Sequence, residues 1–198
     1  IFENIIDALL VNRGLTKSKE IEEFLHPQHP SDITVSDVDI DKNSLKKALA
    51  RIKKAIKNHE SMVVYADYDA DGITAGAIMW EALHALGANV MPHIPHRTSE
   101  GYGLSKKGID MIHEQYHPTL VITVDHGITA REKVAYAKTL SMDVIVTDHH
   151  VKPEKLPSCI IVHTTKLAGS GISWFVAKAL NSTPGVEADA LLSFAAIG

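Results

Sequence analysis

The chain has 198 residues, and its 20 Lys and Arg against 24 Asp and Glu give a formal net charge of −4. Hydrophobic residues make up 45% and charged residues 22%, which is the composition of a globular protein and excludes a disordered chain. No apolar run reaches the roughly 20 residues of a membrane helix, no secretory signal opens the chain, and the acidic balance argues against general charge-driven binding of nucleic acid unless a metal neutralises some of the acids.

Two details bear on the setting and extent of the chain. Cys159 is the only cysteine, which excludes a disulfide within the chain and a Cys-rich zinc site, and it favours a reducing, cytoplasmic location. The chain begins at Ile1 and stops at Gly198, directly after the apolar stretch 191–197. Because a free terminus is normally polar, we expect the chain to be part of a longer protein.

Residues 1–41 are predicted to form a helical lead-in and a linker. A short apolar-periodic stretch covers 5–11, and a helix is predicted over 17–25. Pro27 and Pro30 end that helix, since proline cannot continue it. The polar, acidic segment 31–41 is predicted to be a linker, which leaves 42–198 as the main domain.

A strong helix is predicted from Asn43 to about Lys57, because its apolar residues recur at spacings of three and four. The rest of its surface is basic and carries no acid. This pattern fits two interpretations, a solvated helix face or a patch that faces phosphate groups. The basic residues are Lys46, Lys47, Arg51, Lys53, Lys54 and Lys57.

The segment after this helix alternates short runs rich in Val and Ile with helical patterns. The pattern is typical of βαβ units, so the fold class is α/β: a parallel β-sheet of about five strands between layers of helices. The strands are expected at 62–66, 89–94, 120–124, 143–147 and 159–162, and the helices between them at 73–86, 106–116 and 130–140.

Three of these strands end in acidic or histidine-containing segments. Residues 67–72 follow the first strand, 125–127 the third and 148–150 the fourth; they read Asp-Tyr-Asp-Ala-Asp-Gly, Asp-His-Gly and Asp-His-His. Because the carboxyl ends of parallel strands lie at one edge of a sheet, we expect these side chains to gather there. Each Asp-Gly alone fits a turn or a helix N-cap, but three such segments together indicate a metal site.

Several carboxylates at a buried strand end repel one another and require a compensating cation. Asp oxygens with His nitrogens, and no thiolates, favour Mn²⁺ or Mg²⁺. The number of acids exceeds what one ion needs, so the sequence predicts two divalent ions and phosphoryl chemistry, with Mn²⁺ preferred.

The three segments resemble successive motifs of the DHH phosphoesterase superfamily. A longer stretch, Pro-His-Arg-Thr-Ser-Glu-Gly-Tyr-Gly-Leu-Ser over 95–105, resembles the signature of the RecJ exonuclease family within it. The lead-in at 10–14 and 21–27 and the Leu-Ala-Gly-Ser-Gly segment at 167–171 are similar to that family too. The likeness covers nearly the whole chain.

This resemblance implies roles for individual residues near the metals. It places metal ligands at Asp69, Asp71, Asp125 and His149, with Asp125 bridging the two ions. His150 would lie close to the scissile phosphate. Asp148 would support the histidines, and Asp67 would be a further motif residue, so these three complete the expected catalytic group.

It also implies residues that bind the substrate. His96 and Arg97 would hold phosphate oxygens, and the segment Glu100, Gly101, Tyr102 and Gly103 would let the backbone approach the nucleic acid. Gly169, Ser170 and Gly171 open a predicted helix, so they fit either a phosphate-binding loop or a simple packing turn.

The chain departs from the family pattern in two ways. Tyr65 stands where the family commonly has a histidine, and a phenol is a poorer ligand for Mn²⁺, so one ion would be held more weakly. The family pattern also continues beyond the Gly198 equivalent into another metal-binding Asp and a second, DHHA1-type substrate domain. We therefore expect the domain over 42–198 to stop before its last ligand, and residues 1–198 alone to have weak or no turnover.

The function implied is a metal-dependent 5′-to-3′ exonuclease on single-stranded DNA that releases 5′-mononucleotides in DNA repair and recombination. The resemblance also implies single-strand-binding protein and a repair helicase as partners, though no residue of the sequence argues for them. One alternative is a phosphoesterase for short oligonucleotides or nucleotide bisphosphates. Another is a non-catalytic replication scaffold of the same fold, which would be expected to lose ligands that this chain retains.

Overall fold

A computed structural model describes residues 2–180 and 190–198 of the chain. The chain divides into two compact units, one up to Thr34 and the other from Val35 to Gly198. The first unit contains two helices and a 3₁₀ turn: α1 (Phe2–Asn12), α2 (Ser18–Leu25) and η1 (Pro30–Asp32). The helix predicted over 17–25 is therefore present as α2, and the apolar-periodic stretch 5–11 lies within α1.

The segment predicted as a linker over 31–41 is only partly a linker. From Val35 onward it belongs to the second unit, and Val38 and Ile40 are buried there. Asp41 then caps the next helix, because its Oδ1 accepts the Ser44 N–H at 2.7 Å. The two apolar side chains, spaced two apart in an acidic segment, anchor it to the domain.

The second unit is built on one parallel sheet, which confirms the predicted fold class. Its strand order is β2-β1-β3-β4-β5, and every neighbouring pair is parallel. All residues of β1 and β3 are buried, as expected for strands covered on both faces. The strands are β1 (Met62–Tyr65), β2 (Val90–His93), β3 (Leu120–Val124), β4 (Asp143–Asp148) and β5 (Ile160–His163).

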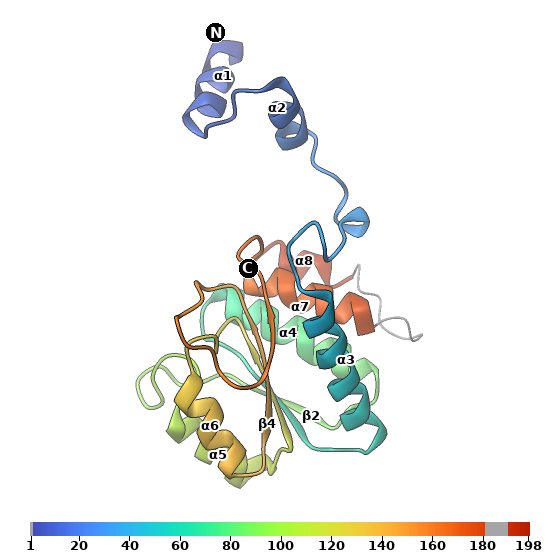
Figure 1. Cartoon of the computed structure of the whole chain (residues 1–198), viewed down its shortest axis with the longest axis vertical. Coiled ribbons are helices and arrows are strands. Elements are labelled where there is room, and N and C mark those ends of the chain that lie inside the picture. The colour runs from blue at the N-terminus through green and yellow to red at the C-terminus, as the bar shows by residue number, and fades with distance from the viewer. Residues whose placement is uncertain (1, 181–189) are drawn as a thin grey trace. The chain divides into compact units, whose positions relative to one another are not determined.

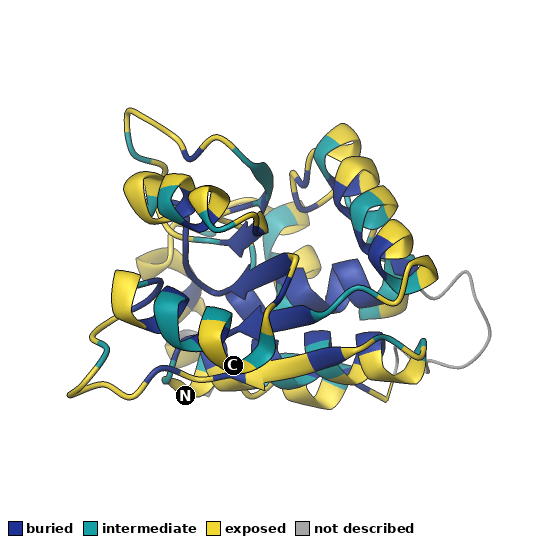
Figure 2. Cartoon of the chain, turned by 90° about the horizontal axis from the view of Figure 1, so that it is seen from below, coloured by how far each residue is buried: buried dark blue, intermediate teal, exposed yellow. Residues whose placement is uncertain are grey.

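Helices cover both faces of this sheet (Figure 1). One layer contains α3 (Lys42–Lys57), α4 (Ala70–Ala85) and α7 (Gly169–Leu180), and the short α8 (Leu192–Ala195) packs on α4 and α7. The other layer contains α5 (Lys106–Tyr116) and α6 (Arg131–Thr139). Figure 2 shows buried strands at the centre and helices whose outer sides are exposed. No helix in the described part of the chain is both long and apolar enough to cross a membrane.

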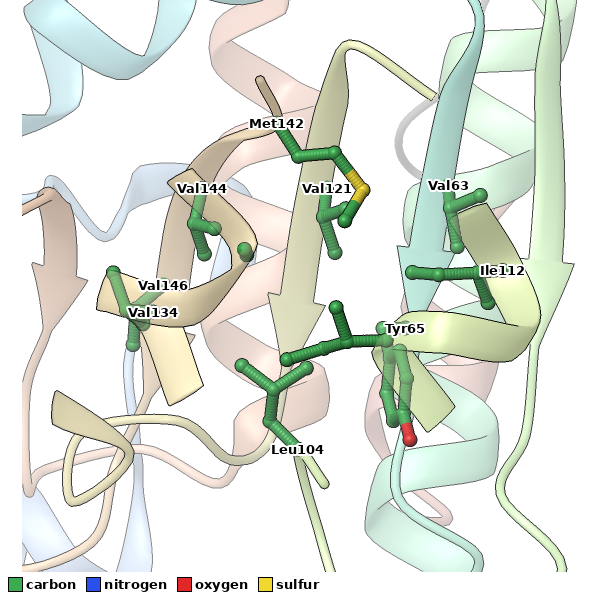
Figure 3. Packing of buried hydrophobic residues seen from close by; sticks show 11 residues of the cluster. Val63, Tyr65, Leu104, Ile112, Val121, Val134, Met142, Val144 and Val146 are labelled. Atoms are coloured by element: carbon green, nitrogen blue, oxygen red, sulfur yellow. The ribbon is translucent and has the colours of Figure 1, made fainter. Parts of the chain in front are cut away.

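The core under α5 and α6 follows the alternation of side chains along the strands. Val63 and Tyr65 of β1 point to this side and pack with Ile112 of α5 and Val121 of β3 (Figure 3). Tyr65 is fully buried within this cluster. The core therefore fixes the strands whose carboxyl ends carry the acidic segments.

Candidate metal centre

The register of the sheet brings three carboxylates together. Pairing of β1 with β3 and of β3 with β4, continued past the strand ends, sets Asp67 beside Asp125 and Asp125 beside Asp148. The backbone pairing of β3 with β4 extends as far as Asp125, because the Asp125 N–H donates to the Thr147 carbonyl at 3.0 Å. The three carboxylates are at most 2% exposed, so they form a buried row.

The segment after β1 delivers three acids with different contacts. Asp67 Oδ1 accepts the Tyr68 N–H at 2.7 Å, while Asp67 Oδ2 is buried and receives no hydrogen bond from the described residues. Asp69 caps α4, accepting the Gly72 N–H at 2.9 Å. Asp71 lies in the first turn of α4 and accepts N–H groups from the start of α7. The segment after β1 thus supplies three carboxylates to the site and connects the first turns of α4 and α7 to them.

Asp125 occupies the centre of the row. Its φ of 65° is in the left-handed region, which Asp tolerates better than most residues. Its Oδ1 is buried without a hydrogen bond from the described residues and lies 3.1 Å from His149 Nε2. A Cβ on Gly169 would lie 2.6 Å from that same oxygen, so a glycine is needed there for the helix to approach.

The segment after β4 contributes the two histidines. Asp148 Oδ1 accepts the His150 N–H at 3.0 Å and His150 Nδ1–H at 2.8 Å, and Oδ2 accepts the Ile128 N–H at 2.8 Å. Asp148 therefore fixes both the turn and the ring of His150. His149 Nε2 lies 3.6 Å from Asp71 Oδ2, so it faces the acids that follow β1 and β3.

Two groups of side chains are close enough to hold a metal ion, with ligand atoms within 4.8 Å of one another. One group is Asp125, His149 and His150; the other is Asp67, Asp69 and Asp125. Asp125 is common to both, which is the arrangement that a carboxylate bridging two ions requires. Carboxylate and imidazole donors without thiolates fit Mn²⁺ or Mg²⁺.

The electrostatics of the row fit a cation as well. Burial, together with the nearby charges of Asp71 and Asp69, raises the pKa of Asp125 to about 9. Burial also acts to raise the pKa of Asp148, but the N–H groups of His150 and Ile128 outweigh it and bring that pKa below its ordinary value. Asp125 is thus the carboxyl that a divalent cation would ionise.

Mn²⁺ binding is therefore expected to release the proton that Asp125 holds at neutral pH. Because the pKa of this carboxyl is raised, Asp125 is protonated below about pH 9 when no metal is bound. Affinity should then rise by about tenfold per pH unit between pH 7 and 8, above the ordinary titration range of imidazole. Calorimetric titration in buffers of different ionisation enthalpy measures the released proton. Asp125→Asn should remove this pH dependence, and its persistence in the variant would contradict the assignment.

The segment predicted to bind substrate forms a loop beside the centre. Glu100 lies inside it rather than at the surface: its carboxylate is 3% exposed, accepts His93 Nε2–H at 2.9 Å and accepts the His96 N–H at 2.8 Å. Glu100 therefore anchors the loop to the end of β2, a position that does not favour direct contact with a phosphate. His96 Nδ1 lies 3.0 Å from the Thr98 hydroxyl, within the same loop.

Other members of the loop reach the acidic segment. The Arg97 guanidinium lies over the Tyr68 ring, 5.2 Å from its centroid, and Tyr68 meets the exposed Tyr102 edge to face at 6.1 Å. Gly101 and Gly103 have positive φ, which shapes the turn around Tyr102. A pocket of about 310 Å³ then runs from this turn to the centre, lined by Tyr102, Gly103, His126, Lys133, Asp148 and His150.

The loop at the start of α7 does not offer its first N–H groups to a phosphate. The N–H groups of Gly169 and Ser170 donate to Asp71 Oδ2 and Oδ1, both at 2.7 Å. These bonds outweigh the effect of burial and hold the pKa of Asp71 below its ordinary value. Of the two interpretations of this segment, the contacts favour a packing turn: its N–H groups hold a carboxylate, and Gly171 lies against Leu167.

Tyr65 does not lie among the candidate ligands, so the expectation that one ion would be held more weakly stays a prediction. Its ring is fully buried on the α5 side, 4.6 Å from the His93 ring and 5.3 Å from the His126 ring. Burial raises the pKa of its phenol to about 12. A Cβ on Gly108 would lie 2.1 Å from its hydroxyl, so the phenol points into the core.

Sequence reasoning missed His163 and the structural role of His126. His163, the last residue of β5, donates through Nε2 to the His150 carbonyl at 2.7 Å and holds the histidine turn from the far strand. His126 Nε2 donates to the Tyr65 carbonyl at 2.9 Å, which joins the β1 and β3 ends. The position of His163 at a strand's carboxyl end was the signal that could have identified it.

Residues 61–198 match the DHH family, N-terminal domain. Over 98% of its length the chain is 38% identical to the single-stranded-DNA-specific exonuclease RecJ of Bacillus subtilis, and it covers 25% of that protein. The chain thus spans about a quarter of this relative's length.

Two solved structures extend the comparison. A crystal structure of exonuclease RecJ bound to manganese aligns with a TM-score of 0.71 at 34% identity, over 77% of this chain and 41% of the other. A crystal structure of Thermus thermophilus RecJ in complex with Mg²⁺ aligns with a TM-score of 0.57 at 26% identity, over 94% of this chain and 23% of the other. Two proteins similar to this chain have thus been crystallised with the two ions that its donor set favours.

Proposed function

The chain belongs to the DHH family, and we propose that it is the metal-binding domain of a phosphodiesterase that degrades single-stranded DNA from the 5′ end. The observation that carries the proposal is Asp125, a buried carboxylate common to two groups of potential ligands. The similarity to RecJ proteins described as specific for single-stranded DNA supports the substrate class. The product would be 5′-mononucleotides.

The residues would divide into ligands and supporting groups. Asp67, Asp69 and Asp125 would hold one ion, and Asp125, His149 and His150 the other. We keep Asp71 as a further candidate ligand, since its oxygens retain lone pairs after accepting N–H groups from α7. Two divalent ions would supply positive charge that polarises a phosphoryl oxygen and lowers the pKa of a water.

The chain's own side chains would position the substrate. Asp148 would keep the His150 ring in one orientation, so that its Nε2 is the atom free to face a metal ion or a phosphoryl oxygen. Arg97 would bind a phosphate through its planar guanidinium, and Tyr102 would stack on a base. Glu100 would act through the loop it anchors, as a positioning residue.

The whole protein's role goes beyond this chain. We propose that the protein acts in DNA repair and recombination, in the cytoplasm, with single-strand-binding protein and a repair helicase as candidate partners. Support for the role comes from the RecJ relatives, of which this chain matches about a quarter to a third. The retained acids and histidines of the site favour an enzyme over a non-catalytic scaffold.

The proposal is tested with the full-length protein, Mn²⁺ and 5′-labelled substrates. We expect a long single strand to be degraded to mononucleotides from its 5′ end, and a blunt duplex of the same sequence to be resistant. A dinucleotide should be a much poorer substrate than the long strand. Preference for the dinucleotide would instead assign a phosphoesterase of short oligonucleotides, and no Mn²⁺-dependent hydrolysis of either would overturn the proposal.

A further inference from the structure

The outward face of α3 carries six exposed lysines and no acid. Its buried residues, Leu45, Ala48, Ile52 and Ala55, face the sheet layer. At about 100° per residue the lysines fall within roughly 140° of the opposite side of the helix, which makes one continuous surface. We call this surface the lysine face; its members are Lys42, Lys46, Lys47, Lys53, Lys54 and Lys57.

None of these six lysines forms an ion pair within the part of the chain that the structure describes, although Lys47 is close enough to help lower the pKa of the Asp41 carboxylate. Among residues 2–180 and 190–198, the ion pairs of α3 are made by Arg51, which contacts Glu60 and Asp143 at 2.7 Å. The face also sets like charges one turn apart, as at Lys42 and Lys46 or Lys53 and Lys57, which destabilises a helix in isolation. A solvated helix normally intersperses acids to avoid this repulsion.

The lysine face begins on the side of the sheet where the carboxyl ends of the strands, and with them the metal centre, lie. Before α3, the Asp37 carbonyl and the Asp39 carboxylate contact Lys166 Nζ at 3.2 and 3.0 Å, just ahead of the Gly169 turn. After α3, a short turn leads into β1 at the opposite edge of the sheet. The sixteen residues of α3 therefore carry the face about 24 Å away from the centre, over β5.

We propose that the lysine face binds the phosphate backbone of the single strand outside the metal centre. The inference rests on the proposed function and adds a second contact region for the same substrate. The exposed positions between the lysines, Asn43 and Ala50, offer no aromatic or large apolar group, so recognition there is by charge alone. Charge without base contacts suits a sequence-independent polyanion better than an acidic protein segment with apolar anchors.

The test compares two variants of equal charge in the 198-residue chain. Lys46→Gln/Lys53→Gln removes two charges from the face, and Lys138→Gln/Lys155→Gln removes two exposed lysines outside α3. Fluorescence anisotropy with a long single strand is measured over a salt series in Ca²⁺-free EDTA buffer. Each lost contact to a single strand should lower the slope of log K against log salt by about 0.7, so the face variant should lose about 1.4 and the control almost nothing.

The outcomes separate this inference from the proposed function. A dinucleotide is too short to span the face, so Mn²⁺-dependent binding of the dinucleotide should be the same in both variants. Equal slopes in the two variants with intact binding of the long strand would overturn the inference and leave the proposed function standing. A face that binds an acidic peptide while strand binding is unchanged would also overturn it. Failure of the unmodified chain to bind any strand, with or without Mn²⁺, would count against both.

Discussion

Replacing Asp125 by Asn in the full-length protein is expected to reduce the rate of Mn²⁺-dependent hydrolysis of single-stranded DNA by about a hundredfold to a thousandfold. Asp125 belongs to both groups of potential ligands, so losing its charge weakens both at once. Asn has the same size and also tolerates the left-handed φ of 65° found at this position. The variant therefore changes charge with little change in backbone. Initial rates and the stoichiometry of bound Mn²⁺ measure the effect.

Asp143→Asn is the matched control for this experiment. Asp143 is the first residue of β4, at the end of the strand farthest from the metal centre. Its carboxylate is 61% exposed and pairs with Arg51. The control should retain bound Mn²⁺ and nearly full activity, with a loss of folding stability below about 1 kcal/mol. Retained activity in the Asp125 variant would refute both the shared-ligand assignment and the proposed mechanism.

Gly169→Ala should weaken Mn²⁺ binding by about tenfold to a hundredfold, an effect typical of changes next to metal ligands. The added Cβ would lie 2.6 Å from both Cβ and Oδ1 of Asp125, so either the carboxylate or the start of α7 must move. Movement of α7 would also stretch the N–H contacts to Asp71. We expect an accompanying loss of about 1–3 kcal/mol in stability, from overpacking a buried position.

Gly171→Ala tests whether this effect belongs to the carboxylate or to the helix. Its Cβ would lie 3.2 Å from the Leu167 Cβ, a contact that a shift of a few tenths of an ångström relieves. Alanine also favours the helix by up to about 1 kcal/mol. Equilibrium binding of Mn²⁺ and thermal unfolding of both variants decide the point: equal losses at 169 and 171 would show that the helix, and not Asp125, is disturbed.

The sheet could be predicted from the sequence because each of its strands is a short apolar run, and helices separate the first four. Strand boundaries agree within about one residue, and the βαβ pattern predicts that the strands are parallel, though not the order β2-β1-β3-β4-β5. The short α8 was not predicted as a helix, since four residues carry too little periodicity. The part played by Val38 and Ile40 was missed because two apolar residues in an acidic segment resemble a linker.

The site was predictable to the level of strand ends but not of individual contacts. That Asp67, Asp125 and Asp148 would meet follows from parallel strands. That Asp71 would accept two N–H groups from α7 depends on a contact about 100 residues away in sequence, for which no local pattern exists. Likewise nothing local shows that Glu100 turns inward to His93.

The row of acids also determines where this domain tolerates changes in length. The backbone hydrogen bonds of β1, β3 and β4 set the register that aligns the acids of the row. Adding or deleting one residue within one of these strands would therefore turn its acid to the other face of the sheet. The turns at the amino-terminal ends of the strands, such as 58–61 and 117–119, have hydrogen bonds of their own, for example from the Thr119 N–H to the Ser61 carbonyl at 2.9 Å, but none of these bonds involves an acid of the row. A change of length in those turns should therefore leave the row of acids aligned, whereas a change within these three strands should disrupt it.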